Sequence, residues 1–213
     1  MANDQTLDQS DSVDRWVRTA ARDRKSFGQL FDLFHPQIFA YCSRRLLVRA
    51  VAEDVASEVF LKVAKAISSF HGSTTEDFRR WLFRIATNEI NAQLRKSIRQ
   101  RTLLEAAATM GLVGKRISDQ LLETESEVDW QQIYRAIGEL SEREQSIVSL
   151  KFFGQQTHEE IGGVLDIKPA TARVALNRAL GKLRAKLQEP PRDGHLNPTN
   201  SNITSTTKRE ETL

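Results

Sequence analysis

Cysteine is almost absent from this chain of 213 residues, which contains only Cys42. A single thiol cannot form an internal disulfide, which favours a reducing cytosol, and inside an apolar helix it is expected to be a small core residue. Apolar runs approaching 18 residues are absent as well, and no signal peptide is recognisable at the start. We therefore expect a soluble, cytoplasmic protein without membrane insertion.

Strand-like alternation of apolar and polar residues is also missing, and aromatic residues make up only 7% of the chain. Apolar residues recur instead at intervals of three and four, which is the period of an amphipathic helix. We therefore predict an all-α protein. Its length allows two small helical domains, each with its own core.

Residue patterns that support catalysis or metal binding are missing too. The four histidines lie far apart without metal-ligand spacing. The chain has neither a nucleophile paired with a base nor a glycine-rich phosphate loop. We therefore expect no enzyme activity, no catalytic residue, no metal site and no cofactor.

The net charge of +3 conceals an uneven distribution. Residues 1–14 contain four aspartates, the last of them Asp14, and no base, which leaves +7 for the rest of the chain. A basic remainder is compatible with a nucleic acid as partner.

The most informative stretch, residues 157–186, predicts two helices joined by a tight turn. Thr157 and Glu160 form a capping box that starts the first helix. Pro169, whose fixed φ and missing N–H suit the first position of a helix, starts the second. Asp166 stands where such turns commonly carry glycine, so its backbone must reach a left-handed conformation or the turn must take another form.

The second of these helices is expected to have one apolar face and one basic face. Between Lys168 and Gln188 every charged residue is positive. Such a helix suits the major groove of DNA, where Arg and Asn address base edges and Lys contacts phosphates. The alternative is that these charges only solubilise a helical hairpin. The face left free of packing comprises Ala170, Thr171, Arg173, Val174, Asn177 and Arg178.

A second basic surface is predicted on the helix that starts at Phe78. Its apolar residues face one way, and polar residues recur on the other side at spacings of three and four. The alternative is a solvated face on a four-helix bundle. Arg79 and Glu89 do not fit this division, because both fall toward the apolar side. The polar stripe consists of Arg80, Arg84, Asn88, Asn91 and Arg95.

Earlier in the chain, the apolar pattern predicts a short helix from Ser12, a longer one from Ser26 to Leu46, and another over residues 52–69. Pro36 is expected to kink or break the second of them. The loop from Phe70 is rich in turn-forming residues.

Composition then divides the chain into five segments. Residues 1–11 are polar and acidic and are predicted to be disordered, as are the Pro-, Asn-, Ser- and Thr-rich residues 189–213. Residues 12–97 and 128–188 are predicted to be helical domains. Residues 98–127, which end in an acidic run, are predicted to link them.

Together these segments resemble a bacterial RNA polymerase sigma factor of the extracytoplasmic-function (ECF) subfamily. The resemblance spans about residues 12–188. It implies that residues 12–97 correspond to sigma region 2 and residues 128–188 to sigma region 4. The sequence stretches that carry it are, in order, EDVASEVFLKVAKAISSF, FRRWLFRIATNEINAQLRK and LSEREQSIVSLKFFGQQTHEEIGGVLDIKPATARVALNRALGKLRAKL.

This resemblance implies a transcription initiation factor that binds core RNA polymerase, directs promoter recognition and stabilises melted promoter DNA. It also implies an anti-sigma factor as a partner. The helix over residues 52–69 would dock on the clamp of the largest catalytic subunit through Asp54, Ser57 and Glu58, although Ser57 departs from the longer amide usual in the family. The linker would thread through the polymerase.

The same resemblance assigns the DNA contacts. The loop over residues 71–77 and the helix after it would open the minus-ten element and hold the non-template strand. The residues implied for this element are Arg80, Trp81, Arg84, Asn88, Asn91 and Arg95. The helix-turn-helix would read the minus-thirty-five element. The residues implied there are Lys168, Thr171, Arg173, Val174, Asn177 and Arg178.

Two other classes of protein share parts of the pattern. A LuxR-type helix-turn-helix regulator also carries LSEREQ before a capped helix-turn-helix, and it would bind duplex DNA as a dimer without polymerase core. Residues 1–127, however, lack the alternating strands and acidic phosphorylation pocket of a receiver domain. An anti-sigma or adaptor protein would bind polymerase without reading DNA, so neutralising Arg173 and Arg178 would leave its function intact.

Overall fold

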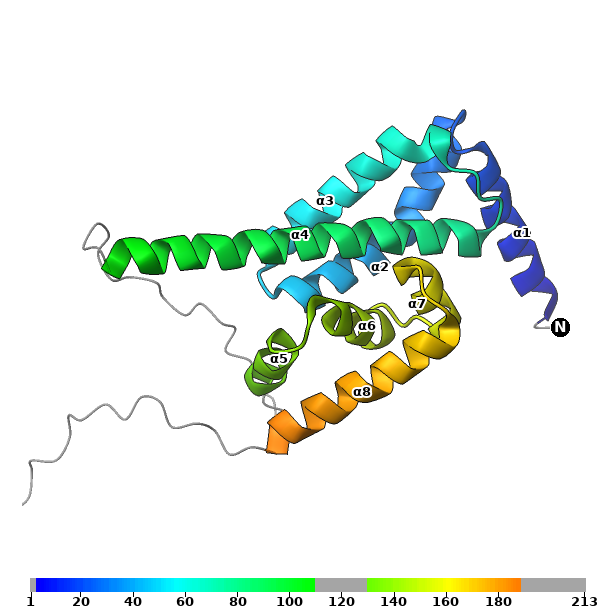
Figure 1. The fold of residues 1–213 in the computed structure, drawn as a ribbon. Helices are drawn as coiled ribbons and strands as arrows, with labels where there is room; N and C mark the ends of the chain where they lie inside the picture. The colour runs from blue at the N-terminus through cyan, green and yellow to red at the C-terminus, as the bar shows by residue number, and fades with distance from the viewer. Residues whose placement is uncertain (1–2, 110–129, 189–213) are drawn as a thin grey trace, which may run out of the picture.

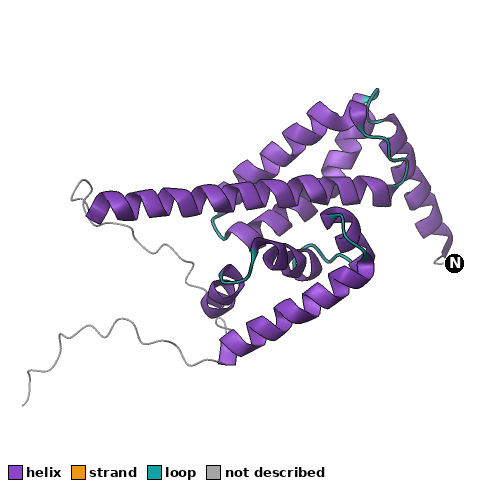
Figure 2. Ribbon diagram, in the orientation of Figure 1, coloured by secondary structure: helices purple, strands orange, loops and turns teal. Residues whose placement is uncertain are grey.

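The computed structural model describes residues 3–109 and 130–188, and every regular element in these two ranges is helical (Figures 1 and 2). This confirms the all-α prediction. The elements are α1 (Asn3–Thr19), α2 (Arg24–Leu46), α3 (Arg49–Ala66), the 3₁₀ turn η1 (Ile67–Ser69), α4 (Thr75–Thr109), α5 (Trp130–Gly138), α6 (Glu142–Phe152), α7 (His158–Leu165) and α8 (Pro169–Gln188).

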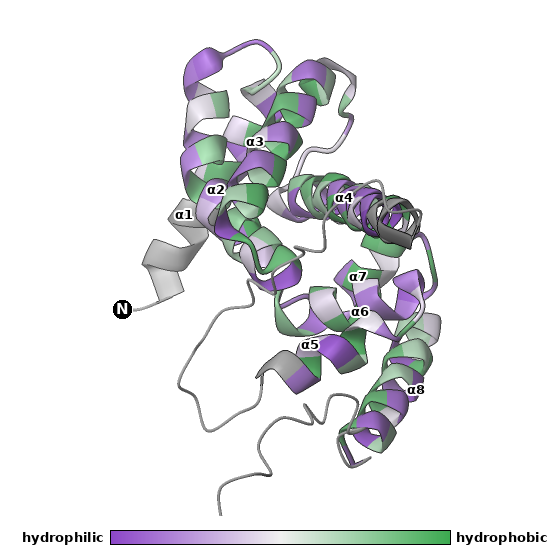
Figure 3. Cartoon of the chain, turned by 90° about the vertical axis from the view of Figure 1, so that its left-hand side faces the viewer, coloured by the Kyte–Doolittle hydropathy of each residue, from purple (hydrophilic) through white to green (hydrophobic). Residues whose placement is uncertain are grey.

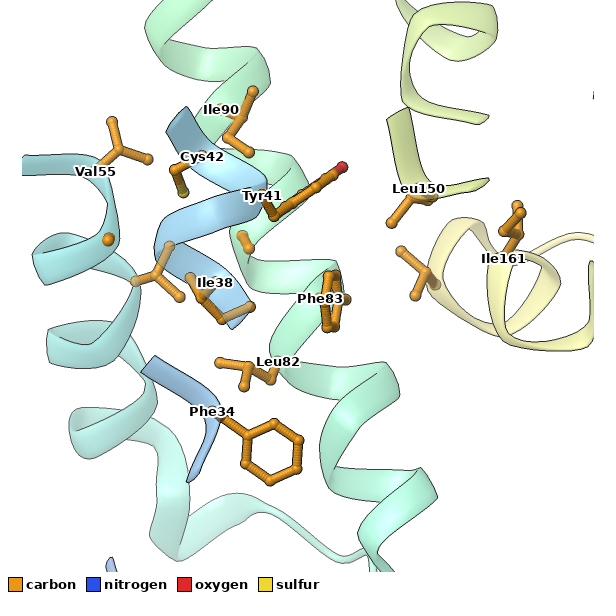
Figure 4. Packing of buried hydrophobic residues seen from close by; sticks show 14 of the residues in the cluster. Phe34, Ile38, Tyr41, Cys42, Val55, Leu82, Phe83, Ile90, Leu150 and Ile161 are labelled. Atoms are coloured by element: carbon orange, nitrogen blue, oxygen red, sulfur yellow. The ribbon is translucent and has the colours of Figure 1, made fainter. Parts of the chain in front are cut away.

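Helices α1 to α4 form the N-terminal domain around a core shared by α2, α3 and α4. Figure 4 shows Ile38 of α2 between Val55 of α3 and Leu82 of α4, and all three side chains are buried. Cys42 lies in the same core, as predicted, and burial raises the pKa of its thiol to about 12.

The break expected at Pro36 is absent, because α2 is a single helix from Arg24 to Leu46. Proline removes one backbone hydrogen bond from a helix interior and crowds the carbonyl four residues earlier. Here Phe34 and Ile38, on either side of the proline, are both buried in the domain core. Tertiary packing of the flanking turns therefore keeps the helix continuous.

Two helices extend beyond their predicted bounds. Helix α1 begins at Asn3 rather than near Ser12, and residues 3–11 contain no glycine or proline that would end it. Helix α4 continues past the predicted domain end at residue 97 to Thr109. The rest of the predicted linker, residues 110–127, and the predicted tail, residues 189–213, lie outside the described residues.

Helices α5 to α8 form the C-terminal domain. Thr157 with Glu160 forms the predicted capping box of α7, and Ser141 with Glu144 forms another at the start of α6. Asp166 ends α7 in the left-handed conformation, with φ of 54° and ψ of 53°. Figure 3 shows hydrophobic and hydrophilic residues interspersed along these helices, as amphipathic packing requires.

The two domains pack against each other along α4. In Figure 1 this long helix has α2 and α3 on one side and the C-terminal helices on the other. Phe83 of α4 is buried, and a β carbon built on Gly154, just after α6, would lie 3.1 Å from its ring. Figure 4 shows Phe83 on the side of α4 that faces Leu150 and Ile161. Within residues 3–109 and 130–188, no helix has the length and apolar character needed to cross a bilayer.

Candidate nucleic-acid and polymerase interfaces

The outer face of α8 presents five of the six residues predicted to read the minus-thirty-five element, and the sixth, Lys168, lies in the turn just before this helix. We call this set the reading face. Each of its side chains is exposed, including the apolar Val174 at 45%. The opposite face of α8 packs into the domain core through Ala172, Leu176 and Leu183. The exposed members are Lys168, Thr171, Arg173, Val174, Asn177 and Arg178.

The turn between α7 and α8 fixes the direction in which the reading face points. Two consecutive backbone N–H groups, those of Asp166 and Ile167, donate to the carbonyl of Gly162. A β carbon at Gly162 would lie only 2.7 Å from the carbonyl oxygen of Ile167. The tight turn therefore requires a residue without a side chain at this position.

Two lysines near the end of α8 hold the helix to its own domain. Lys182 Nζ lies 2.6 Å from Glu144 of α6, and Lys186 pairs with Glu139 in the turn after α5. Hydrogen bonds from Lys182, first, and then from Ser141 hold the pKa of Glu144 below its ordinary value. Both lysines belong to the basic set of this helix noted in the sequence, but in the structure they make ion pairs within the C-terminal domain.

An aromatic pair stands at the start of α4, beside the loop over residues 70–74. Trp81 stacks on Phe70, with ring centroids 4.8 Å apart and an interplanar angle of 28°. Phe78, which is buried, meets Phe70 edge-on at 5.9 Å. The predicted site residue Trp81 is thus half-buried and part of a platform rather than a free ring.

The polar stripe of α4 faces the C-terminal domain over much of its length. Arg84 donates from Nη2 to the carbonyl of Gly163 at 2.5 Å and from Nε to the carbonyl of Val164 at 3.2 Å. Arg95 pairs with Glu142 at 2.6 Å. Asn91 was predicted to face outward, but it is buried. These contacts cover surface that the sequence pattern left open.

The burial of Asn91 has a specific partner. Its Nδ2 donates to the hydroxyl of Ser146 at 3.1 Å, and only 8% of the residue is exposed. Asn88, one turn before, remains exposed, and Arg80 is half-buried beside Asp77 at 3.7 Å. The stripe is therefore open at Asn88, partly open at Arg80 and covered at Asn91.

Arg79, which did not fit the predicted division of α4, belongs to the same interdomain contact. Its guanidinium lies 3.6 Å from Glu160 of α7 and 5.8 Å above the ring centroid of Phe83. Glu89, the other misfit, pairs with Lys62 of α3 at 2.6 Å. A charged residue on an apolar arc was thus the one sequence signal that a partner element lay there.

A buried arginine adds another polar contact between the domains. Arg45 of α2 donates from Nη2 to Gln145 Oε1 of α6 at 2.5 Å, and only 9% of the residue is exposed. Burial lowers the pKa of this guanidinium. The sequence did not predict this pair, because a separation of 100 positions leaves no local pattern.

The exposed face of α3 carries the three residues predicted to bind polymerase. Asp54, Ser57 and Glu58 are all exposed, while the opposite side of α3 is buried. The Ser57 hydroxyl donates to the backbone carbonyl of Glu53 at 2.9 Å. Leu61, one turn beyond, extends this acidic face with an apolar side chain that is 46% exposed.

Comparison with known proteins finds matches to one protein family in both domains of the chain. The family model Sigma-70 region 2 matches residues 30–101, and the model Sigma-70 region 4 matches residues 130–183. The chain is 29% identical over 173 residues to the ECF RNA polymerase sigma factor SigW of Bacillus subtilis, which covers 78% of this chain and 91% of that protein. It is 28% identical to the ECF RNA polymerase sigma-E factor of Escherichia coli, over 80% of this chain and 91% of the relative.

Two solved structures share the fold. One is CnrH in complex with the cytosolic domain of CnrY, with a TM-score of 0.57 and 20% identity over 83% of this chain and 97% of that one. The other is the sigma factor RpoE in complex with the anti-sigma factor NepR from Bartonella quintana, with a TM-score of 0.54 and 22% identity over 76% and 97%. The two matched regions lie within the two helical domains described above, and the first of them begins inside α2.

Proposed function

This chain belongs to the extracytoplasmic-function sigma factors of the sigma-70 family, and we propose a division of that function among α3, α4 and α8. As a sigma factor it binds core RNA polymerase and directs promoter recognition in transcription initiation. It carries out no bond chemistry of its own, since the polymerase makes the RNA. Because it acts with polymerase on the chromosome, its compartment is the cytoplasm.

The reading face of α8 recognises the minus-thirty-five element. The observation that carries this assignment is that all six side chains are exposed, on α8 and at its start, and that the turn at Gly162 holds this helix in a fixed direction. Arg173, Arg178 and Asn177 supply donors for base edges, and a good bidentate contact discriminates between bases by about 1–3 kcal/mol. Lys168 at the helix start contacts a phosphate.

The polar stripe of α4 and the aromatic pair hold the melted minus-ten element. Guanidinium groups spaced along a helix follow a sugar-phosphate backbone, and an aromatic platform accepts an unstacked base with about 1–3 kcal/mol per base. Phe70 and Trp81 form that platform, which lies next to Arg80, the first residue of the polar stripe. The C-terminal domain must move away before Arg84, Asn91 and Arg95 bind DNA, because it now occupies their donors.

The described arrangement is accordingly the polymerase-free form, and docking on core separates the two domains. The exposed face of α3, with Asp54 and Glu58 beside Leu61, contacts the polymerase clamp. Once core holds both domains, each promoter contact raises the effective concentration of the other. Neither domain needs tight DNA binding alone.

An anti-sigma factor is a further partner of this chain. The two solved structures named above are complexes, one of CnrH with the cytosolic domain of CnrY and one of RpoE with the anti-sigma factor NepR. We call the described arrangement, in which the two domains pack along α4, the closed form, and the arrangement with separated domains the open form. An anti-sigma factor would act before the domains separate, by stabilising the closed form or by covering α3.

Reconstitution with core polymerase and run-off transcription tests this function. Arg173→Ala should weaken promoter selection without changing core affinity, whereas Asp54→Ala should weaken core binding and leave the minus-thirty-five contact unchanged. Tight, specific duplex binding by the chain without core would instead favour a LuxR-type regulator. An unaltered core affinity for Asp54→Ala would refute the assignment of α3.

A further inference from the structure

Helix α1 grips the segment that leads into α4. Asp14 of α1 accepts two hydrogen bonds at its Oδ1 atom, one from the backbone N–H of Thr75 and one from the Thr75 hydroxyl, both at 2.6 Å. Thr75 is the first residue of α4, so one of the donors that a helix start leaves unsatisfied is met from another helix. Composition alone grouped Asp14 with the acidic start of the chain.

A second residue of α1 reaches the same segment. Arg18, one turn after Asp14, donates from Nη1 to the carbonyl of Ser73 at 3.4 Å. The two contacts fall on either side of Thr74, so α1 holds the loop at two successive points. One of them carries a full negative charge and the other a full positive charge, which fixes the direction of the loop backbone as well as its place.

The loop is also held by hydrogen bonds of its own residues to one another and to the first turn of α4. The N–H of Asp77 donates to the Thr74 hydroxyl at 3.1 Å, and the N–H of Ser73 donates to Asp77 Oδ2 at 3.3 Å. A β carbon at Gly72 would collide with the ring of Phe70 and with Asp77. The loop is therefore folded tightly over the ring that stacks on Trp81.

Helix α1 is itself firmly placed on the domain. Val17 of α1 and Ala20, just after this helix, are buried at 4% and 6% exposure, and the Thr19 hydroxyl donates to the Ser26 hydroxyl of α2 at 2.8 Å. The carboxylate of Asp14 consequently stands at a fixed point relative to α2 and α4. A contact from a rigid helix can set the position of a loop.

We propose that α1 is a positioning element for the minus-ten loop, residues 70–74, and for its junction with α4, and that Asp14 is its principal residue. The inference rests on the proposed function of the loop and of Trp81 in holding melted DNA. It adds a part of the chain that lies before residue 30, where the match to the sigma region 2 model begins. His71 and Ser73 are exposed at the tip of this loop, and α1 sets where they stand relative to the Phe70–Trp81 platform.

Selection from a random library tests the proposal without a known promoter. Holoenzyme made with the full chain selects open complexes from duplexes randomised at both promoter elements, and sequencing gives the base preference at each. Asp14→Ala should lower the preference at the minus-ten element about 10-fold or more, as expected for loss of hydrogen bonds to a charged acceptor. The preference at the minus-thirty-five element should stay unchanged and serves as the internal control.

Matched variants keep the result interpretable. Asp11→Asn changes an exposed carboxylate one turn earlier on α1 and should select as the unaltered chain does. Thr75→Val removes only the hydroxyl contact and keeps the backbone contact, so it should give an intermediate loss of the minus-ten preference. This variant keeps the proposal testable where Asp14→Ala does not fold.

Three outcomes separate the possibilities. Equal loss at both elements for Thr75→Val and Asp14→Ala would mean a general structural role and would overturn the proposal, as would full retention of the minus-ten preference in both variants. Failure of the proposed function looks different, because the unaltered holoenzyme would then select no two-part site, or Arg84→Ala would leave minus-ten selection untouched.

Discussion

Substitutions at Gly163 should shift the balance between the closed and open forms according to charge. Gly163 lies in α7 at the interdomain contact, where its carbonyl accepts from Arg84. A β carbon there would lie 2.5 Å from Nε of Arg80, so any side chain enters the space of flexible guanidinium groups. Gly163→Lys places a third cation beside Arg80 and Arg84, whereas Gly163→Glu places a carboxylate there.

The magnitude follows from the exposure of the groups. Arg80 has 40% of its side chain exposed, so each new charge pair is screened and contributes about 0.2–1 kcal/mol. Two arginines give about 0.4–2 kcal/mol in each direction, so the lysine and glutamate variants differ by about 0.8–4 kcal/mol. Since about 1.4 kcal/mol corresponds to a factor of ten, the ratio of closed to open molecules should differ by about 4- to 700-fold between them. Replacing glycine inside a helix also favours α7 itself by up to about 1 kcal/mol, so the domain remains folded.

Energy transfer between two dyes measures this ratio. Asp32→Cys on α2 and Ala185→Cys on α8 provide exposed attachment points in the two domains, while the native Cys42 is buried. Gly163→Lys should lower transfer efficiency and raise the apparent affinity for core, because a larger share of molecules is competent to bind. Gly163→Ala separates the steric effect from the charge effect.

Salt provides the second test of the same reasoning. At about 1 M salt the screening length falls to about 3 Å, so the lysine and glutamate variants should converge. Identical transfer for the two variants at low salt would refute the electrostatic account of closure. An unchanged core affinity despite a measured opening would refute the claim that docking on core is coupled to separation of the two domains.

Three further predictions concern stability. Gly162→Ala should destabilise the C-terminal domain by about 1–3 kcal/mol in urea unfolding, since its β carbon meets the backbone of Ile167; an unchanged midpoint would show that the turn can relax. Asp166→Gly should stabilise the same domain by about 0.5–1 kcal/mol, because glycine adopts the left-handed conformation without strain, and a loss of stability would mean that the aspartate side chain contributes there. The folded-state pKa of Glu144 is below its ordinary value of 4.5, so the ionised carboxylate stabilises the fold at neutral pH and this stabilisation is lost as pH falls through the folded pKa. Lys182→Met should therefore make the free energy of unfolding, measured in urea, depend less on pH below 4.5.

The sequence predicted the C-terminal domain well because its signals are local. Capping boxes, the proline at the start of α8 and the left-handed Asp166 each involve residues within a few positions of one another. Such features act through backbone geometry, and the surrounding fold seldom overrides them.

The interdomain contact was not predictable in the same way. Helical periodicity placed Asn91 correctly on the polar stripe, but the period of a helix does not say whether a polar face meets water or another domain. Arg45 and Gln145 meet between the domains across 100 positions, and within the N-terminal domain Asp14 meets Thr75 across 61. Long-range polar pairs of this kind depend on the arrangement of whole helices, and only the two misfit charges on α4 hinted at them.

The partners that cover the α4 stripe have a consequence for how such a protein can change. Carboxylates and helix-end carbonyls are acceptors of the same kind as phosphate oxygens, and in the proposed mechanism both compete for Arg84 and Arg95. An additional arginine on this stripe would bind melted DNA more tightly and would also bind the C-terminal domain more tightly. A change on the stripe that strengthens binding of melted DNA therefore also makes the two domains harder to separate. The domain contact can be weakened alone only by changing its acceptors on α6 and α7, which lie outside the proposed minus-ten surface.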